Sequence, residues 1–128
     1  MNIQIPGVDV DKVIELYEDD IDLFVKVARS YVSSTPLVLD KLRLIKDNMT
    51  ANQDGSAGAL ADYAVSIHSV KGTSTTVGAE ETRIAALNLE KMAKAGNLSG
   101  VLAETPAFLK HMDKLLDDLR RWLEQFDA

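Results

Sequence analysis

The chain has 128 residues, which is long enough for one domain with its own core. It carries 20 acidic and 14 basic residues, a formal net charge of -6, and no cysteine. The acidic balance argues against a nucleic-acid binder and against docking on an anionic membrane, and the cysteine count excludes disulfides, thiolate metal sites and cysteine nucleophiles. No apolar run approaches the roughly 18 residues of a membrane span, and the first residues do not resemble a secretory signal, so we expect a cytoplasmic protein.

Apolar residues recur every three or four positions in four long segments, which is the spacing of an amphipathic helix. These segments cover residues 20–48, 57–77, 80–95 and 106–126. A short helix over about 9–18 precedes them, with Asp9 as its capping residue. Because four such helices must bury their stripes against one another, we expect a single all-α domain over residues 1–128. The predicted fold is an antiparallel four-helix bundle with a short additional N-terminal helix.

Turn and capping residues agree with these boundaries. Residues 48–58 are polar and contain glycine, which is typical of a loop. Gly78 and the pair Gly96-Asn97 are placed to end the third and fourth long helices. Thr105-Pro106 is placed to begin the last one, with proline at the first helical position. Pro36 lies inside the first long segment, where the uninterrupted apolar spacing favours one kinked helix over two.

Residues 68–79, with the sequence HSVKGTSTTVGA, form an unfavourable helix. Gly72 costs about 1 kcal/mol relative to alanine in a helix interior. The hydroxylated residues at 73–76 add to this cost, because their side chains compete with the helical backbone or lose rotamer freedom. A sequence selected only for the stability of a bundle does not cluster such residues, so we expect this segment to carry a function.

Helical spacing places His68, Lys71, Gly72 and Thr75 on one face, next to the apolar stripe of the same helix. His68 should therefore stand at the solvent boundary. A neutral imidazole has a lone pair that can attack an acyl phosphate on another protein and form a phosphoramidate. An ammonium one turn away favours the resulting anion, and a glycine on the same face lets a partner come close.

Each of these residues also has an ordinary structural interpretation. A helical histidine is usually structural or simply exposed, a lysine is usually a solvated charge, and a helical glycine is usually a packing contact. The conjunction of His68, Lys71 and Gly72 on one face weakens that interpretation, but the physical argument alone leaves both readings open.

The same residues resemble the motif of histidine phosphotransfer (HPt) domains, which is close to His-x-Leu-Lys-Gly-x-Ser/Ala-x-x-hydrophobic-Gly-Ala. The matching positions are His68, Val70, Lys71, Gly72, Ser74, Val77, Gly78 and Ala79. The one departure is Val70 for leucine, a core substitution with little bearing on chemistry. A less specific resemblance continues through Ala86, Leu89, Glu90 and residues 95–97 downstream, and through Ile21–Phe24 and Pro36 upstream.

The resemblance implies that His68 is phosphorylated on Nε2, that Lys71 stabilises the phosphoryl group, and that Gly72 gives the partner access. It further implies that Ser74 permits close helix packing and that Gly78 terminates or packs the helix. The docking surface in such domains surrounds the histidine and is partly apolar. The candidates here are Ala61, Val65, Ser69 and Thr75.

The function this predicts is a phosphorelay intermediate, which takes a phosphoryl group from the aspartate of one receiver domain and passes it to another. The chain has no glycine-rich nucleotide loop and no kinase signature, so we do not expect an enzyme in the usual sense, a cofactor or a metal site. The partner receiver would supply the aspartate and the magnesium, and we expect the chain to be a monomer.

Two other functions compete with this one. The first is an interaction module that binds a receiver or a scaffold without being phosphorylated, against which the intact His68, Lys71 and Gly72 argue. The second is a small hydrolase or metal-dependent bundle enzyme, which is the weakest because only two histidines and no Glu-x-x-His spacing occur.

Three other residues are assigned no chemistry. We expect His111 to be structural or exposed. We expect Glu90 to be a surface or helix-contact carboxylate, and Trp122 to belong to the core.

Overall fold

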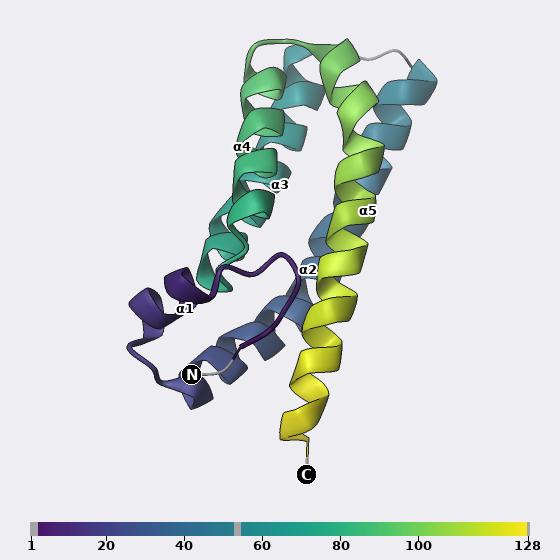
Figure 1. The fold of residues 1–128 in the computed structure, drawn as a ribbon. Helices are drawn as coiled ribbons and strands as arrows, with labels where there is room; N and C mark the ends of the chain where they lie inside the picture. Colours follow the sequence, from purple (N-terminus) through teal and green to yellow (C-terminus); the bar gives the residue numbers. More distant parts are fainter. Residues whose placement is uncertain (1–2, 53–54, 128) are drawn as a thin grey trace.

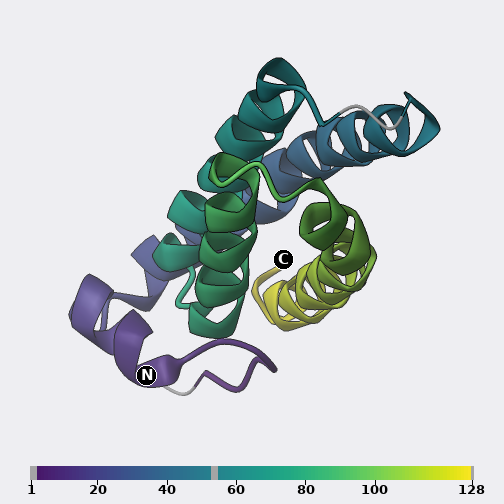
Figure 2. The same cartoon turned by 90° about the horizontal axis from the view of Figure 1, so that it is seen from above.

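A computed structural model describes residues 3–52 and 55–127. This part of the chain is all-helical, with five α-helices, a final turn of 3-10 helix and no strand. The elements are α1 (Val10–Tyr17), α2 (Ile21–Asn52), α3 (Ala57–Thr76), α4 (Glu80–Lys94), α5 (Leu98–Leu123) and η1 (Glu124–Phe126) (Figure 1). Contacts join α2 to α3, α3 to α4, α4 to α5 and α5 back to α2, so these helices enclose one core (Figure 2).

The apolar stripes seen in the sequence line this core. Phe24 and Leu42 of α2 and Ile67 of α3 have no exposed surface. The ring of Phe24 packs against Trp122 of α5 with 5.4 Å between ring centroids, so Trp122 is a core residue as expected. Burial of each such side chain contributes about 1.5–3 kcal/mol, which makes the stripes the main force that holds the helices together.

Two hydrogen bonds between hydroxyl groups cross the core. The Tyr31 and Ser74 hydroxyls lie 2.9 Å apart and connect α2 to α3, and the Tyr63 and Thr105 hydroxyls lie 2.6 Å apart and connect α3 to α5. Burial raises the pKa of each tyrosine to about 12, so both phenols stay neutral and keep their protons for these bonds. Ser74 thus does more than leave room for helix packing, because its hydroxyl satisfies a buried phenol.

The N-terminal segment is attached at the end of α3. Asp9 caps α1 by accepting the backbone N–H of Asp11 at 3.0 Å, as the sequence indicates. The backbone N–H of Asp9 donates to the carbonyl of Gly78 at 2.7 Å. Gly78 has a φ of +71°, and a Cβ there would lie 2.7 Å from Cγ2 of Val13. Gly78 therefore ends α3 and also lets α1 approach closely.

The expected start of the last helix at Thr105-Pro106 is wrong, because α5 begins at Leu98. The side chain of Asn97 caps the earlier start by accepting a first-turn N–H at 3.0 Å. Val101 and Thr105 are completely buried, and the Thr105 hydroxyl donates to the carbonyl of Val101 at 2.5 Å. Burial of this added segment stabilises the helix by more than the loss of one backbone hydrogen bond at Pro106 destabilises it.

The first long helix also extends further than expected. α2 ends at Asn52, so residues 48–52 of the predicted loop are helical, and residues 53–54 of that loop lie outside the described residues. Ser56 then caps α3 by accepting the N–H of Ala59 at 3.2 Å. α2 passes through Pro36 as one helix, in agreement with the continuous apolar spacing.

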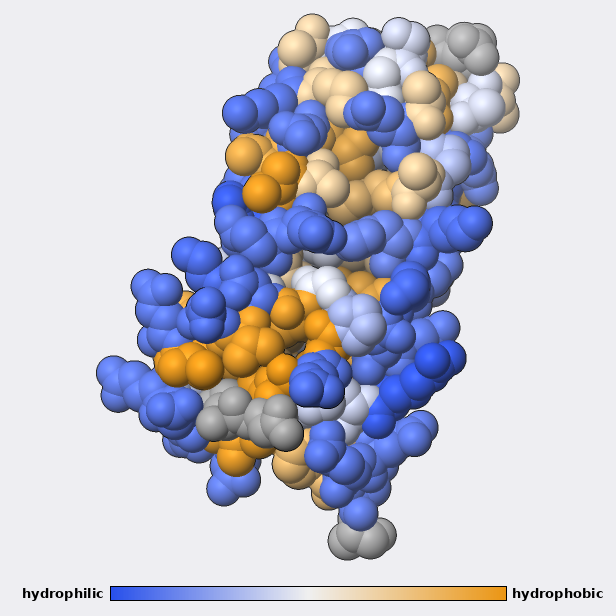
Figure 3. Space-filling model, in the orientation of Figure 1, coloured by the Kyte–Doolittle hydropathy of each residue, from blue (hydrophilic) through white to orange (hydrophobic). Residues whose placement is uncertain are grey.

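Among the described helices, none has both the length and the apolar character needed to cross a bilayer. Hydrophilic side chains cover most of the face shown in Figure 3, whereas apolar residues gather near α1 and the N-terminal segment. Ile3 and Ile5 of that segment are buried, so the segment packs against the core.

Candidate functional site

His68 lies on the outer face of α3, with 63% of its side chain exposed. Its neighbours Ile67 and Val70 are buried in the core. The imidazole therefore stands at the boundary between core and solvent, where the helical spacing predicts it. A partner protein can reach it without a rearrangement of the fold.

A buried carboxylate holds one nitrogen of this ring. Nδ1 of His68 lies 2.7 Å from Oε2 of Glu90, which comes from the neighbouring helix α4. Only 4% of the Glu90 side chain is exposed. This contact fixes the direction of an otherwise exposed imidazole, because α3 and α4 are packed along their lengths.

Two lysines bind the same carboxylate. Nζ of Lys71 donates to Oε1 of Glu90 at 2.7 Å, and Nζ of Lys94 lies 3.4 Å from Oε2. Burial alone would raise the pKa of Glu90, but the hydrogen bonds from Lys71, His68 and Lys94 outweigh it and lower this pKa to about 2. Glu90 is thus ionised at neutral pH and can only accept hydrogen bonds.

The ionised state of Glu90 determines the tautomer of His68. Since the carboxylate cannot donate, Nδ1 must carry the hydrogen that joins the two groups. In the neutral ring the lone pair then lies on Nε2, and no described side chain makes a hydrogen bond to that atom. The arrangement leaves a nucleophilic nitrogen facing solvent, and the carboxylate behind it holds the ring in the orientation that exposes this nitrogen.

The other residues predicted for this face are open to solvent. A Cβ at Gly72 would meet nothing within 4 Å, so there is open space at this position one turn beyond His68. Val65 is 68% exposed and presents an apolar side chain to solvent one turn before His68. Ala61, Ser69 and Thr75 are also exposed. The structure therefore brings Lys71 to the histidine and leaves the candidate docking residues uncovered around it.

The hydroxylated residues that follow His68 stay helical by bonding to their own helix. The hydroxyl of Thr73 donates to the carbonyl of Ser69 at 3.0 Å, and that of Thr75 donates to the carbonyl of Lys71 at 3.2 Å. Such bonds satisfy the side chains but add little stability. They leave the outer face of this segment with short side chains, which suits close approach by a partner.

The sequence did not identify Glu90 as part of the site. Of the two interpretations given to it, surface carboxylate is wrong and helix contact is correct. Its spacing held a signal, because Glu90 lies four residues after Ala86 and three before Ala93, both buried. A carboxylate on the apolar side of a helix needs a cationic or donor partner, and the neighbouring helix supplies one.

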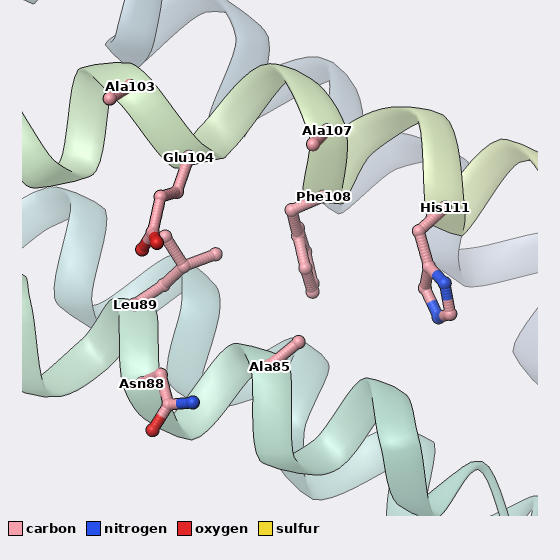
Figure 4. Close-up of a pocket in the computed structure, with 8 residues that line it drawn as sticks. All are labelled: Ala85, Asn88, Leu89, Ala103, Glu104, Ala107, Phe108 and His111. Carbon is pink, nitrogen blue, oxygen red and sulfur yellow. The ribbon is translucent and has the colours of Figure 1, made fainter.

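His111 takes no part in this site. Its Nε2 lies 2.6 Å from the hydroxyl of Thr82, which fits a structural role. It lines one end of a cavity of about 410 Å³ between α4 and α5 (Figure 4). In Figure 4 the ring of Phe108 projects into this space beside small side chains, including Ala85 and Ala107. The cavity is lined by residues of α4 other than Glu90, which is turned toward α3.

Within the described part of the chain, no cluster of three or more histidine and carboxylate side chains has the geometry to hold a metal ion. What the site offers instead is an oriented imidazole, a buried carboxylate and two ammonium groups.

Comparisons of this chain with protein-family models, with curated proteins and with solved structures found no match.

Proposed function

We propose that this chain is a histidine phosphotransfer domain and that His68 carries the phosphoryl group on Nε2. The observation that carries the proposal is the contact between Nδ1 of His68 and the buried, ionised Glu90. It prepares one nitrogen of an exposed imidazole as a nucleophile, which a merely structural histidine does not need. We further propose that the helices form an antiparallel four-helix bundle preceded by the short helix α1.

We infer a transfer step that this geometry would permit. The lone pair of Nε2 attacks the phosphorus of an aspartyl phosphate on a receiver domain. The N–P bond forms as the bond from phosphorus to the aspartate oxygen breaks, and the aspartate leaves as a carboxylate. The ring of His68 keeps its Nδ1 proton and becomes positively charged, and the negative charge of Glu90 stabilises it.

The electrostatics also suit the product. Glu90, Lys71 and Lys94 together carry one net positive charge beside a neutral ring. A phosphoryl group brings about two negative charges at neutral pH, by analogy with other phosphorylated side chains. The site therefore attracts the phosphoryl group.

The partner would approach over the outer face of α3. Gly72 gives it room, and Val65 offers an apolar contact beside the histidine. The partner supplies the acyl phosphate and the magnesium ion, so this chain acts as a carrier of the phosphoryl group. Transfer in the reverse direction follows the same path, because the N–P bond on His68 and the acyl phosphate bond on the receiver are both reactive.

The proposal is tested by incubating the protein with a panel of receiver domains phosphorylated with ³²P, alongside His68→Gln and His111→Gln variants. We expect acid-labile, base-stable label on the wild type and on His111→Gln, and none on His68→Gln. Binding of a receiver without any transfer of label would overturn the proposal and favour an interaction module that is not phosphorylated.

A further inference from the structure

The two lysines at Glu90 are held in different ways. Lys71 donates to Oε1 at 2.7 Å and has 23% of its side chain exposed. Lys94 is 3.4 Å from Oε2 and has 66% of its side chain exposed. Lys71 is thus a close and partly covered partner of the carboxylate, whereas Lys94 is a distant and solvated one.

The loss of each lysine would have different consequences for Glu90. In the described structure Lys71 is the one side chain that donates to Oε1, so its departure leaves a buried carboxylate oxygen without a partner. Oε2 also accepts from Nδ1 of His68, so it keeps a hydrogen bond when Lys94 leaves. A buried acceptor without a hydrogen-bond partner destabilises the protein. Departure of Lys71 would create such an acceptor, whereas departure of Lys94 would not.

Lys94 also lies on the side of the carboxylate that contacts the imidazole of His68. It and the imidazole both contact Oε2, so its ammonium is a neighbour of the ring, and its flexible four-carbon stem is in solvent. The phosphoryl oxygens would lie beyond Nε2, at the solvent side of the same ring. A rotation of the exposed stem can bring the ammonium to them.

We propose, on the basis of the function proposed above, that Lys94 is the residue that contacts the phosphoryl group on His68, and that Lys71 mainly positions Glu90. The motif around His68 implies the first role for Lys71, so this proposal moves that role from α3 to α4. In the unphosphorylated protein Lys94 rests on Glu90, and it transfers to the phosphoryl oxygens when the N–P bond forms.

The test uses the full chain phosphorylated with phosphoramidate, which requires no partner protein. Lys94→Met keeps the length of the side chain but removes its charge. Lys91→Met is the matched control, because Lys91 is exposed on the same helix and lies outside the site. Lys71→Met is the third variant. A ³¹P NMR titration then reports the ionisation of the phosphoryl group itself, which a purely structural role does not change.

For Lys94→Met we expect the acid dissociation constant of the phosphoryl group to fall by roughly threefold. This change corresponds to the loss of one exposed ion pair. Lys91→Met should leave the constant unchanged. Lys71→Met should slow phosphorylation with a smaller effect on the titration. The proposal is overturned if Lys94→Met titrates like Lys91→Met, or if the Lys71→Met shift is the larger one. If the wild type accepts no phosphoryl group at His68, the proposed function fails, and this assignment fails with it.

Discussion

Replacement of Glu90 by glutamine should slow phosphorylation of His68 while the protein stays folded. The amide oxygen of glutamine can still accept the hydrogen of Nδ1, which now lies 2.7 Å from Oε2. What is lost is the negative charge that stabilises the ring as it becomes positive. Charge-assisted hydrogen bonds are about twice as strong as neutral ones, so the loss is roughly 1.5 kcal/mol, or about tenfold in rate.

The fold should tolerate this change. Lys94 is 66% exposed and its ammonium can return to water. Lys71 is 23% exposed, and its ammonium is held against the buried carboxylate, so it loses more favourable interaction than Lys94 does. We expect a loss of at most about 2 kcal/mol in the free energy of unfolding, against the ~5–15 kcal/mol that ordinarily stabilises a domain.

The assay is the initial rate of phosphorylation by phosphoramidate, with urea denaturation measured on the same samples. Glu104→Gln is the control, since it removes an exposed carboxylate from α5, away from the histidine. A Glu90→Gln variant that is folded and phosphorylated as fast as Glu104→Gln would refute the reasoning that the carboxylate activates Nε2.

Other consequences concern stability and access to the site. Because the pKa of Glu90 falls to about 2 in the folded protein from the usual glutamate value of 4.5, its stabilising contribution is complete above about pH 4.5 and is lost as the pH falls through about 2. Urea midpoints measured from pH 6 to pH 2 should therefore fall less in Glu90→Gln than in the wild type, and parallel curves would contradict the assignment. Gly72→Ala should stabilise the protein by up to about 1 kcal/mol, since the helix has open space there, and Gly72→Leu should impair transfer from a receiver but not phosphorylation by phosphoramidate. If Gly72→Leu slowed phosphorylation equally with the receiver and with phosphoramidate, Gly72 would not provide access for the receiver. Gly78→Ala should cost about 1–3 kcal/mol in urea denaturation, because its φ is +71° and a Cβ would press on Val13, and an unchanged midpoint would contradict this.

The parts of the fold that follow from apolar spacing were accessible from the sequence. Residues such as Phe24, Ile67 and Met112 recur at helical intervals and are buried where that spacing places them. The exposure of His68 followed from the same rule, because it lies about 100° around the helix from the stripe. These features depend on one helix at a time, which is what a single sequence reports well.

The start of α5 was missed for a local reason. Thr105-Pro106 is a common beginning of a helix, and the pair Gly96-Asn97 was assigned only to the end of the preceding helix. The deciding factor was the burial of Val101 and Thr105 against other helices, which no local signal near the proline shows.

Glu90 was missed because its role depends on a contact between helices. Its partner Lys71 is 19 residues earlier in the chain and on another helix. The register between α3 and α4 cannot be derived from a single sequence, so the contact of the carboxylate with the histidine was not predictable. The same limitation hid Lys94, whose ammonium lies 3.4 Å from the Glu90 carboxylate and comes near His68 only once α4 is packed against α3.

The central claim is that Nε2 of His68 accepts a phosphoryl group because Glu90 holds Nδ1. The most direct measurement is ¹⁵N NMR of the histidine-labelled protein after transfer from a phosphorylated receiver, since coupling between nitrogen and phosphorus identifies the atom that carries the group. We predict that phosphorus is coupled to Nε2 of His68 and that Nδ1 keeps its proton. Phosphorus on Nδ1, or on His111, would contradict the claim.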